Sequence, residues 1–134
     1  MAGPYRAPKR WQVELNIRSA EAHGYALNRF GGGRIFAVVP HLLCRSYDDE
    51  FSDSFFLGGT LELMRRCDAV AVAPGWGLSE GTSGELAEAE RLHLPRFFQI
   101  EPSDQAAAIL AHAEQESLQH ALTLRLLARR REAA

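Results

Sequence analysis

The chain has few residues of the kinds that hold metals or build disulfide scaffolds. It contains two cysteines, Cys44 and Cys67, among 134 residues, and it has neither a signal peptide nor an apolar run of membrane-spanning length. A reducing cytoplasm is therefore the expected setting. Its five histidines have no partners at metal-ligand spacing, and His41 with Cys44 lacks the second pair that a structural zinc site needs. The sequence predicts no metal site.

An excess of charge of one sign is also lacking. The formal net charge is -2, and only one of the 15 basic residues is a lysine, Lys9. This balance predicts neither a nucleic acid nor a membrane as partner. With 46% apolar and 24% charged residues, the composition is ordinary for a globular protein. The length fits one domain spanning residues 1–134.

Two short apolar runs predict strands that are covered on both faces. Residues 35–39 (IFAVV) and 69–73 (AVAVA) have no polar face, and a proline follows each of them. Residues 96–100 (RFFQI) are a third strand candidate. The acidic stretch 47–50 (YDDE) lies in a polar loop after the first run, where a lid or pocket wall is expected, and each acid is interpreted singly as solvated.

Apolar residues at helical spacing predict four helices. They span about 12–30, 55–66, 82–94 and 103–131, the last capped by Ser103. The buried face of the first helix is predicted at Val13, Ile17, Ala20, Gly24 and Leu27. The alternation of helices and strands predicts a doubly wound parallel α/β sheet of flavodoxin or Rossmann type, with a long C-terminal helix.

The turn after residues 69–73 carries the most chemical information. Residues 75–81 (GWGLSEG) lead into a helix whose predicted N-cap is Thr82. In open α/β sheets ligands bind at the carboxyl ends of strands, and a helix N-terminus offers free N–H groups to an anion. The turn lacks the Gly-Lys-Ser/Thr of a P-loop and the third glycine of the dinucleotide fingerprint. ATP and dinucleotides are therefore not the predicted ligands.

Glu85 lies in the first turn of that helix and has two interpretations. An ionised carboxylate there can attack a sugar carbon or stabilise an oxocarbenium ion. Thr82 and Glu85 also have capping-box spacing, in which the glutamate only returns a hydrogen bond to the cap residue. Spacing alone favours the cap. Ser79 can equally be a turn hydroxyl or a ligand contact. Trp76 can equally be a ligand contact or a surface aromatic that closes the pocket or contacts another subunit.

Residues 79–86 (SEGTSGEL) resemble the Ser-x-Gly-x-x-x-Glu-Leu motif of the nucleoside 2-deoxyribosyltransferase superfamily, particularly its 2'-deoxynucleoside 5'-monophosphate N-hydrolases. Residues 3–6 (GPYR) are similar to the Gly-x-x-Arg turn that follows the first strand of that superfamily. Together with PH at 40–41 and CDAVAVAPGW at 67–76, the pattern most resembles a small uncharacterised bacterial branch of it. The resemblance covers the chain from Gly3 to about Phe98.

The resemblance implies that Glu85 is the catalytic nucleophile, which attacks C1' of the sugar of a nucleoside or nucleotide. Water would resolve the glycosyl-enzyme in a hydrolase, and a second nucleobase would do so in a transferase. Arg6 and Ser79 would contact a phosphate. No metal or organic cofactor is implied. The candidate substrate-binding residues are Gly3, Tyr5, Arg6, His41, Trp76, Ser79, Gly81 and Thr82.

Two departures from the superfamily keep other functions open. Thr60 stands where the superfamily carries an acid, and a threonine cannot protonate a leaving base as an acid does. The first strand, which is central in the superfamily's sheet, should precede Gly3, so we expect a start upstream of Met1. Without that strand, segments 35–39 and 69–73 would lie roughly 10 Å apart.

The alternative functions are a non-catalytic nucleotide-binding module and an oligomeric scaffold with a vestigial pocket. A homodimer or higher homo-oligomer is expected. Its contact would use apolar residues of the C-terminal helix, namely Ala106, Ile109, Ala113, Leu118, Leu122 and Leu126. The alternative for these residues is packing against the sheet, which is favoured for the first half of the helix.

Overall fold

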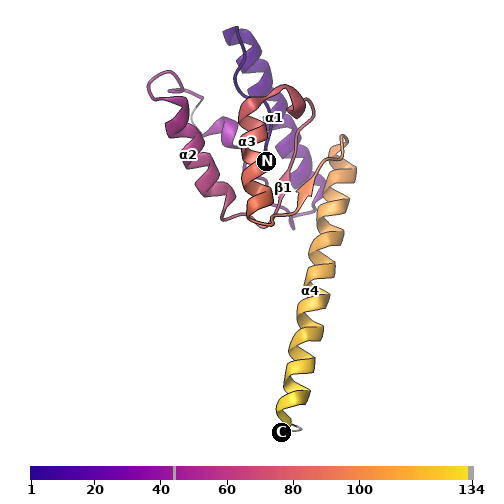
Figure 1. The fold of residues 1–134 in the computed structure, drawn as a ribbon. Coiled ribbons are helices and arrows are strands. Elements are labelled where there is room, and N and C mark those ends of the chain that lie inside the picture. The colour runs from indigo at the N-terminus through magenta and orange to yellow at the C-terminus, as the bar shows by residue number, and fades with distance from the viewer. Residues whose placement is uncertain (44, 133–134) are drawn as a thin grey trace.

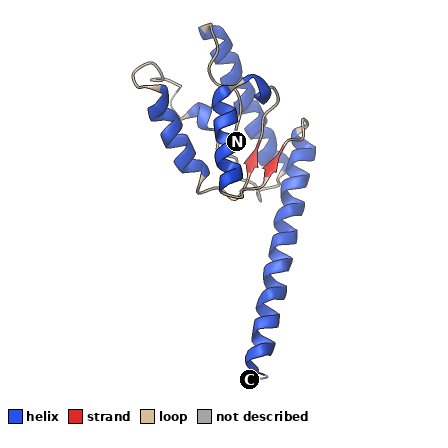
Figure 2. Cartoon of the chain, viewed as in Figure 1, coloured by secondary structure: helices blue, strands red, loops and turns tan. Residues whose placement is uncertain are grey.

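A computed structural model of the chain describes residues 1–43 and 45–132, and it is mostly helical. About 61% of the chain is helix, and the described strands are β1 (Val70–Ala71) and β2 (Arg96–Phe97), which pair in parallel. Figure 2 shows this small sheet among the helices. The predicted doubly wound, many-stranded sheet is therefore wrong. The two paired strands are too short, and too few, to form the central layer of that fold.

The four predicted helices are present, with small differences in their bounds. They are α1 (Arg10–Phe30), α2 (Asp53–Met64), α3 (Glu80–Arg91) and α4 (Pro102–Glu132), with 3-10 turns η1 (Pro40–Leu42) and η2 (Trp76–Leu78) between them. The predicted buried face of α1 is confirmed at all five positions. This helix ends where Gly32 and Gly33 take positive φ angles of 58° and 79°, which glycine adopts at little cost.

The strand β1 lies between two helical layers. Val70 and Val72 pack with Leu86 and Ala89 of α3, whereas Ala71 packs toward α1 and α4. Figure 1 shows α1 and α3 close to β1, with α4 starting beside the sheet. Residues 70–73 are all buried, so the prediction that this apolar run is covered on both sides is confirmed.

The apolar run 35–39 is not a strand. Phe36 is 88% exposed, and the main-chain N–H of Ala37 donates to the side chain of Asn28 at 2.7 Å. The amino group of Met1 donates to the carbonyl of Val38 at 2.8 Å. A run without polar residues therefore did not guarantee burial, because within the described residues no helix covers the Phe36 side of this segment.

Residues 1–2 lie between that segment and β1. Ala2 forms an isolated parallel bridge with Val72, with its N–H 2.9 Å from the carbonyl of Ala71 and its carbonyl 2.8 Å from the N–H of Ala73. The separation expected between the two apolar runs is thus occupied by this segment. It also brings Gly3 so close to β1 that an added Cβ would lie 2.9 Å from the Cβ of Ala73.

The long helix α4 confirms the predicted C-terminal helix, but it begins at Pro102, so Ser103 lies within it and is not its cap. At 1.5 Å per residue its 31 residues span about 46 Å, and Figure 1 shows its C-terminal part extending away from the other elements. Exposed leucines on that part are Leu118, Leu122, Leu124, Leu126 and Leu127. Self-association through this helix stays a prediction. No helix in the described part of the chain combines the length and apolarity needed to cross a membrane.

Candidate functional site

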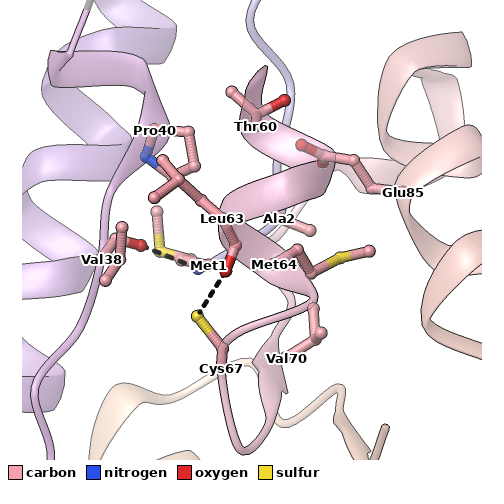
Figure 3. Close-up of a pocket in the computed structure, with 10 residues that line it drawn as sticks. All are labelled: Met1, Ala2, Val38, Pro40, Thr60, Leu63, Met64, Cys67, Val70 and Glu85. Carbon is pink, nitrogen blue, oxygen red and sulfur yellow. Dashed lines mark hydrogen bonds between the residues drawn. The ribbon is translucent and has the colours of Figure 1, made fainter. Parts of the chain in front are cut away.

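Glu85 lines a small cavity between α2, α3 and the N-terminal segment. The cavity has a volume of about 20 Å³, which is room for one water molecule. Figure 3 shows its walls, which are mostly apolar. The lining residues are Met1, Ala2, Val38, Pro40, Thr60, Leu63, Met64, Cys67, Val70 and Glu85.

The Glu85 carboxylate is partly buried, and no described residue donates a hydrogen bond to it or forms an ion pair with it. Burial raises its pKa from 4.5 to about 7, because the charged form loses solvation that nothing replaces. The charge of the Met1 amino group opposes this rise. A carboxyl group with this pKa is present in both protonation states at neutral pH, which is typical of groups that transfer protons or attack a substrate.

The capping-box interpretation of Glu85 is wrong. The N-cap of α3 is Ser79, whose hydroxyl oxygen accepts the N–H of Thr82 at 3.3 Å. Ser79 has an extended backbone, whereas residues from Glu80 onward are already helical. Glu85 is therefore the sixth residue of α3, in its second turn and not in its first as predicted, which is too far along to reach back to the cap.

Thr60 lies in the same cavity as Glu85. Its hydroxyl donates to the carbonyl of Leu57 at 3.1 Å, one turn earlier in α2. Figure 3 shows the Thr60 hydroxyl and the Glu85 carboxylate pointing toward one another. The position that departs from the superfamily is thus next to the predicted nucleophile in space.

A second, larger cavity lies at the carboxyl end of β1. Its volume is about 730 Å³, which is within the range of small-molecule sites. It collects four of the predicted substrate-binding residues, Gly3, Arg6, His41 and Ser79, from three separate segments of the chain. Glu85 does not line it. The structure therefore divides the predicted site between two cavities.

His41 is buried at the wall of the larger cavity. Its Nε2 lies 3.2 Å from the carbonyl of Gly3 and 2.9 Å from that of Pro4. Since a carbonyl can only accept, Nε2 carries the proton, and Nδ1 is left as a buried acceptor without a partner among the described residues. Burial lowers the pKa of His41, although the two carbonyls oppose this, so the ring is neutral at pH 7.

Asp48 organises the polar side of this region, so the interpretation of each acid in the stretch 47–50 as solvated is wrong for this residue. It is 3% exposed, and its carboxylate accepts from the Tyr5 hydroxyl at 2.7 Å and from Arg10 at 2.9 Å. Burial alone would raise its pKa. The hydrogen bonds from Arg10 and Tyr5 and the charges of Arg10 and Arg6 outweigh that effect and hold the pKa of Asp48 below its ordinary value. The only sequence signal was the pair of arginines at positions 6 and 10.

Arg6 is held by the same acid. One guanidinium nitrogen lies 3.5 Å from an Asp48 carboxylate oxygen, and another donates to the Asp48 carbonyl at 3.2 Å. That second nitrogen also forms an ion pair with Asp53. Arg6, the predicted phosphate contact, therefore lines the cavity with its guanidinium group already paired to two acids.

The remaining predicted binding residues line neither cavity. Trp76 packs against Phe98 with ring centroids 5.5 Å apart, and Tyr5 packs against His41 at 5.6 Å. Thr82 is 1% exposed, and its hydroxyl has no partner among the described residues. Gly81 is exposed beside Ser79. Their substrate-binding roles stay predictions.

In the described residues, no group of three or more His, Cys, Asp and Glu side chains is arranged to hold a metal ion. Comparisons with protein-family models, with curated proteins and with solved structures found no significant match.

Proposed function

We propose that the protein breaks the N-glycosidic bond of a nucleoside or nucleotide, with Glu85 as the nucleophile. The observation that carries this proposal is the unpartnered Glu85 carboxylate in an apolar cavity, whose pKa is raised to about 7. A partly buried acid without hydrogen bonds from the protein costs stability, and a carboxyl group with a raised pKa in a cavity is a candidate for chemistry. The resemblance of residues 79–86 to a glycosyl-transferring motif assigns that chemistry to a sugar carbon.

In the proposed reaction the ionised Glu85 attacks C1' of the sugar and forms a glycosyl ester. The C1'–N bond breaks, and its electron pair leaves with the base, which takes a proton from water. A water molecule, or a second base, then attacks C1' and releases the carboxylate. Thr60 cannot protonate the departing base as a carboxylic acid would, so the reaction is expected to favour bases that leave readily.

The sugar has to reach Glu85 through a change in the cavity wall. A volume of about 20 Å³ does not hold a pentose. The helix α2 supplies Thr60, Leu63 and Met64 to this wall and buries none of its own residues. Because it has no buried residue, whereas β1 on the opposite wall is buried, we expect α2 to be the element that moves when substrate binds.

The test is release of free base from a panel of nucleosides and nucleoside 5'-monophosphates. Glu85→Gln should abolish release while leaving binding, measured by calorimetry, within about threefold of wild type. The matched control is Glu90→Gln, because Glu90 is an exposed acid on the same helix, paired only with Arg96. Base release by the Glu85→Gln variant at the wild-type rate would refute the proposal, as would a wild type that releases no base.

A second function, ligand binding without catalysis, is favoured by one observation. The larger cavity contains Gly3, Arg6, His41 and Ser79 but not Glu85. If this function holds, nucleosides or nucleotides bind with the same affinity to wild type and to Glu85→Gln, and neither protein releases base.

A further inference from the structure

We propose that Asp53, together with Asp48, makes the larger cavity selective for uncharged nucleosides over their phosphates by holding Arg6 in ion pairs. The inference rests on the proposed function for the nucleoside nature of the ligand. It deepens that function by naming the substrate class and the residues that decide it.

The first support is the lack of an available cation in the cavity wall. Arg6 is the only arginine or lysine among the lining residues, and its guanidinium is shared between Asp48 and Asp53. His41 donates its proton to main-chain carbonyls. His23 makes a hydrogen bond of 2.7 Å to the side-chain oxygen of Gln105. Among these described lining residues, none offers an unpaired positive charge to a phosphate.

The second support is the charge balance around Arg6. Its neighbour Arg10 shares Asp48 and is itself 2.9 Å from Glu14 and 3.8 Å from Asp49. The two arginines therefore face four carboxylates, counting Asp53, and the cluster is net negative. A 5'-phosphate carries a charge of about -1.5 to -2 at pH 7 and would have to displace these acids or approach them. Like charges make either course unfavourable.

The third support is the N-terminus of α3, which is the other place where an anion could bind. The Ser79 hydroxyl, which lines the cavity, already accepts the N–H of Thr82. Glu80 adds a carboxylate to the first turn of this helix. An acid in that position satisfies the positive end of the helix dipole and opposes a second anion. Hydroxyl groups of a sugar, in contrast, can bond to Ser79 and to the main chain without adding charge.

Calorimetric titration of the full chain with the four common 2'-deoxynucleosides and their 5'-monophosphates tests this inference. At low salt, at least one nucleoside should bind about tenfold or more tightly than its own monophosphate. Inorganic phosphate should not compete with it. Asp53→Asn should strengthen monophosphate binding about tenfold and leave nucleoside binding unchanged, because it releases one of the two acids on Arg6. Asp53 is 73% exposed in its side chain, so this variant is expected to fold.

The matched control is Asp49→Asn, which removes the same charge from the loop that immediately precedes α2. Asp49 makes no contact with Arg6 and lies 3.8 Å from Arg10. It should change the ratio of the two affinities much less than Asp53→Asn does. Equal or tighter binding of the monophosphate by the wild type would overturn the inference, as would an unchanged ratio in Asp53→Asn.

Base release measured on the same samples separates this inference from the proposed reaction. Selective nucleoside binding without base release would support the inference and refute the reaction. Base release with a preference for monophosphates would support the reaction and overturn the inference. Absence of binding by every nucleoside and nucleotide would overturn both.

Discussion

Replacing Glu85 by glutamine should stabilise the protein in a pH-dependent way. The carboxyl group has a pKa of about 7 when folded and an ordinary value of 4.5. The folded state therefore holds this proton more tightly than the unfolded chain does. The stability linked to this group is fully present below pH 4.5 and is lost as the pH rises to about 7 and beyond.

The expected magnitude follows from that difference in pKa. One pKa unit corresponds to about 1.4 kcal/mol, so ionising Glu85 in the folded protein costs about 3 kcal/mol more than in the unfolded chain. Between pH 5 and pH 8.5 the wild type should lose about 2.5 kcal/mol relative to Glu85→Gln, whose amide does not titrate. The other titrating groups are common to both proteins and cancel in this comparison, except the Met1 amino group, whose pKa is raised by the charge of Glu85.

Urea unfolding followed by circular dichroism at the two pH values measures this difference. The control on the same helix is Glu88→Gln, because ion pairs with Arg91 and Arg65 lower the pKa of Glu88 to about 2. That variant should be destabilised at pH 7, with the loss shrinking as the pH falls below 4.5. A difference between wild type and Glu85→Gln that stays constant from pH 5 to pH 8.5 would refute the assignment of a desolvated carboxyl group.

Three further predictions concern the reaction at Glu85 and two glycines of the helices. If ionised Glu85 is the nucleophile, kcat/KM for base release should rise with pH up to about 7 and then level off, and a profile that falls over this range would contradict that role. Gly24→Ala should destabilise the protein by about 1–3 kcal/mol, because the new Cβ would lie 2.3 Å from Cγ2 of Val39. A Cβ added at Gly84 would have no atom within 4 Å, and alanine favours a helix more than glycine does. Gly84→Ala should therefore stabilise the protein by about 0.5–1 kcal/mol in the same unfolding assay.

The helices could be predicted because their signals are local. The five positions that mark the buried face of α1 repeat with the period of a helix, and the glycines at 31–33 end it. The start of α3 was misplaced by three residues because both Ser79 and Thr82 can cap a helix. Only the backbone angles distinguish them, since Ser79 is extended and the residues after it are helical.

The strands were predicted less well because a strand depends on its partners. Residues 69–73 and 35–39 have the same apolar character, yet the first contains β1 and is buried, whereas the second exposes Phe36. Which helices cover an apolar run is decided by packing between distant segments. The doubly wound sheet was inferred on the assumption that helices cover both runs on both faces. In the structure the run 35–39 is not covered in this way, and the described strands form a sheet of two.

The candidate site shows the same division. Glu85 could be selected from its place after a glycine-rich turn, but its missing partners and raised pKa depend on α2 and residues 1–2. Asp48 could not be distinguished from Asp49, its neighbour in an acidic loop. One is 3% exposed and binds two arginines and a tyrosine, and the other has an 86% exposed side chain.

By itself the sequence determined where helices form, which glycines end a helix, and that an acid follows a strand and a turn. These properties follow from the covalent structure and from neighbours within a few residues. Tertiary structure alone decided that the acid lacks hydrogen bonds, that Arg6 is paired, and that the predicted binding residues line two cavities instead of one. The acids that pair with Arg6 are 42 and 47 positions away in the chain, and the cavity around Glu85 is closed by residues of α2 and of the N-terminus, so no local pattern encodes ion pairing or desolvation.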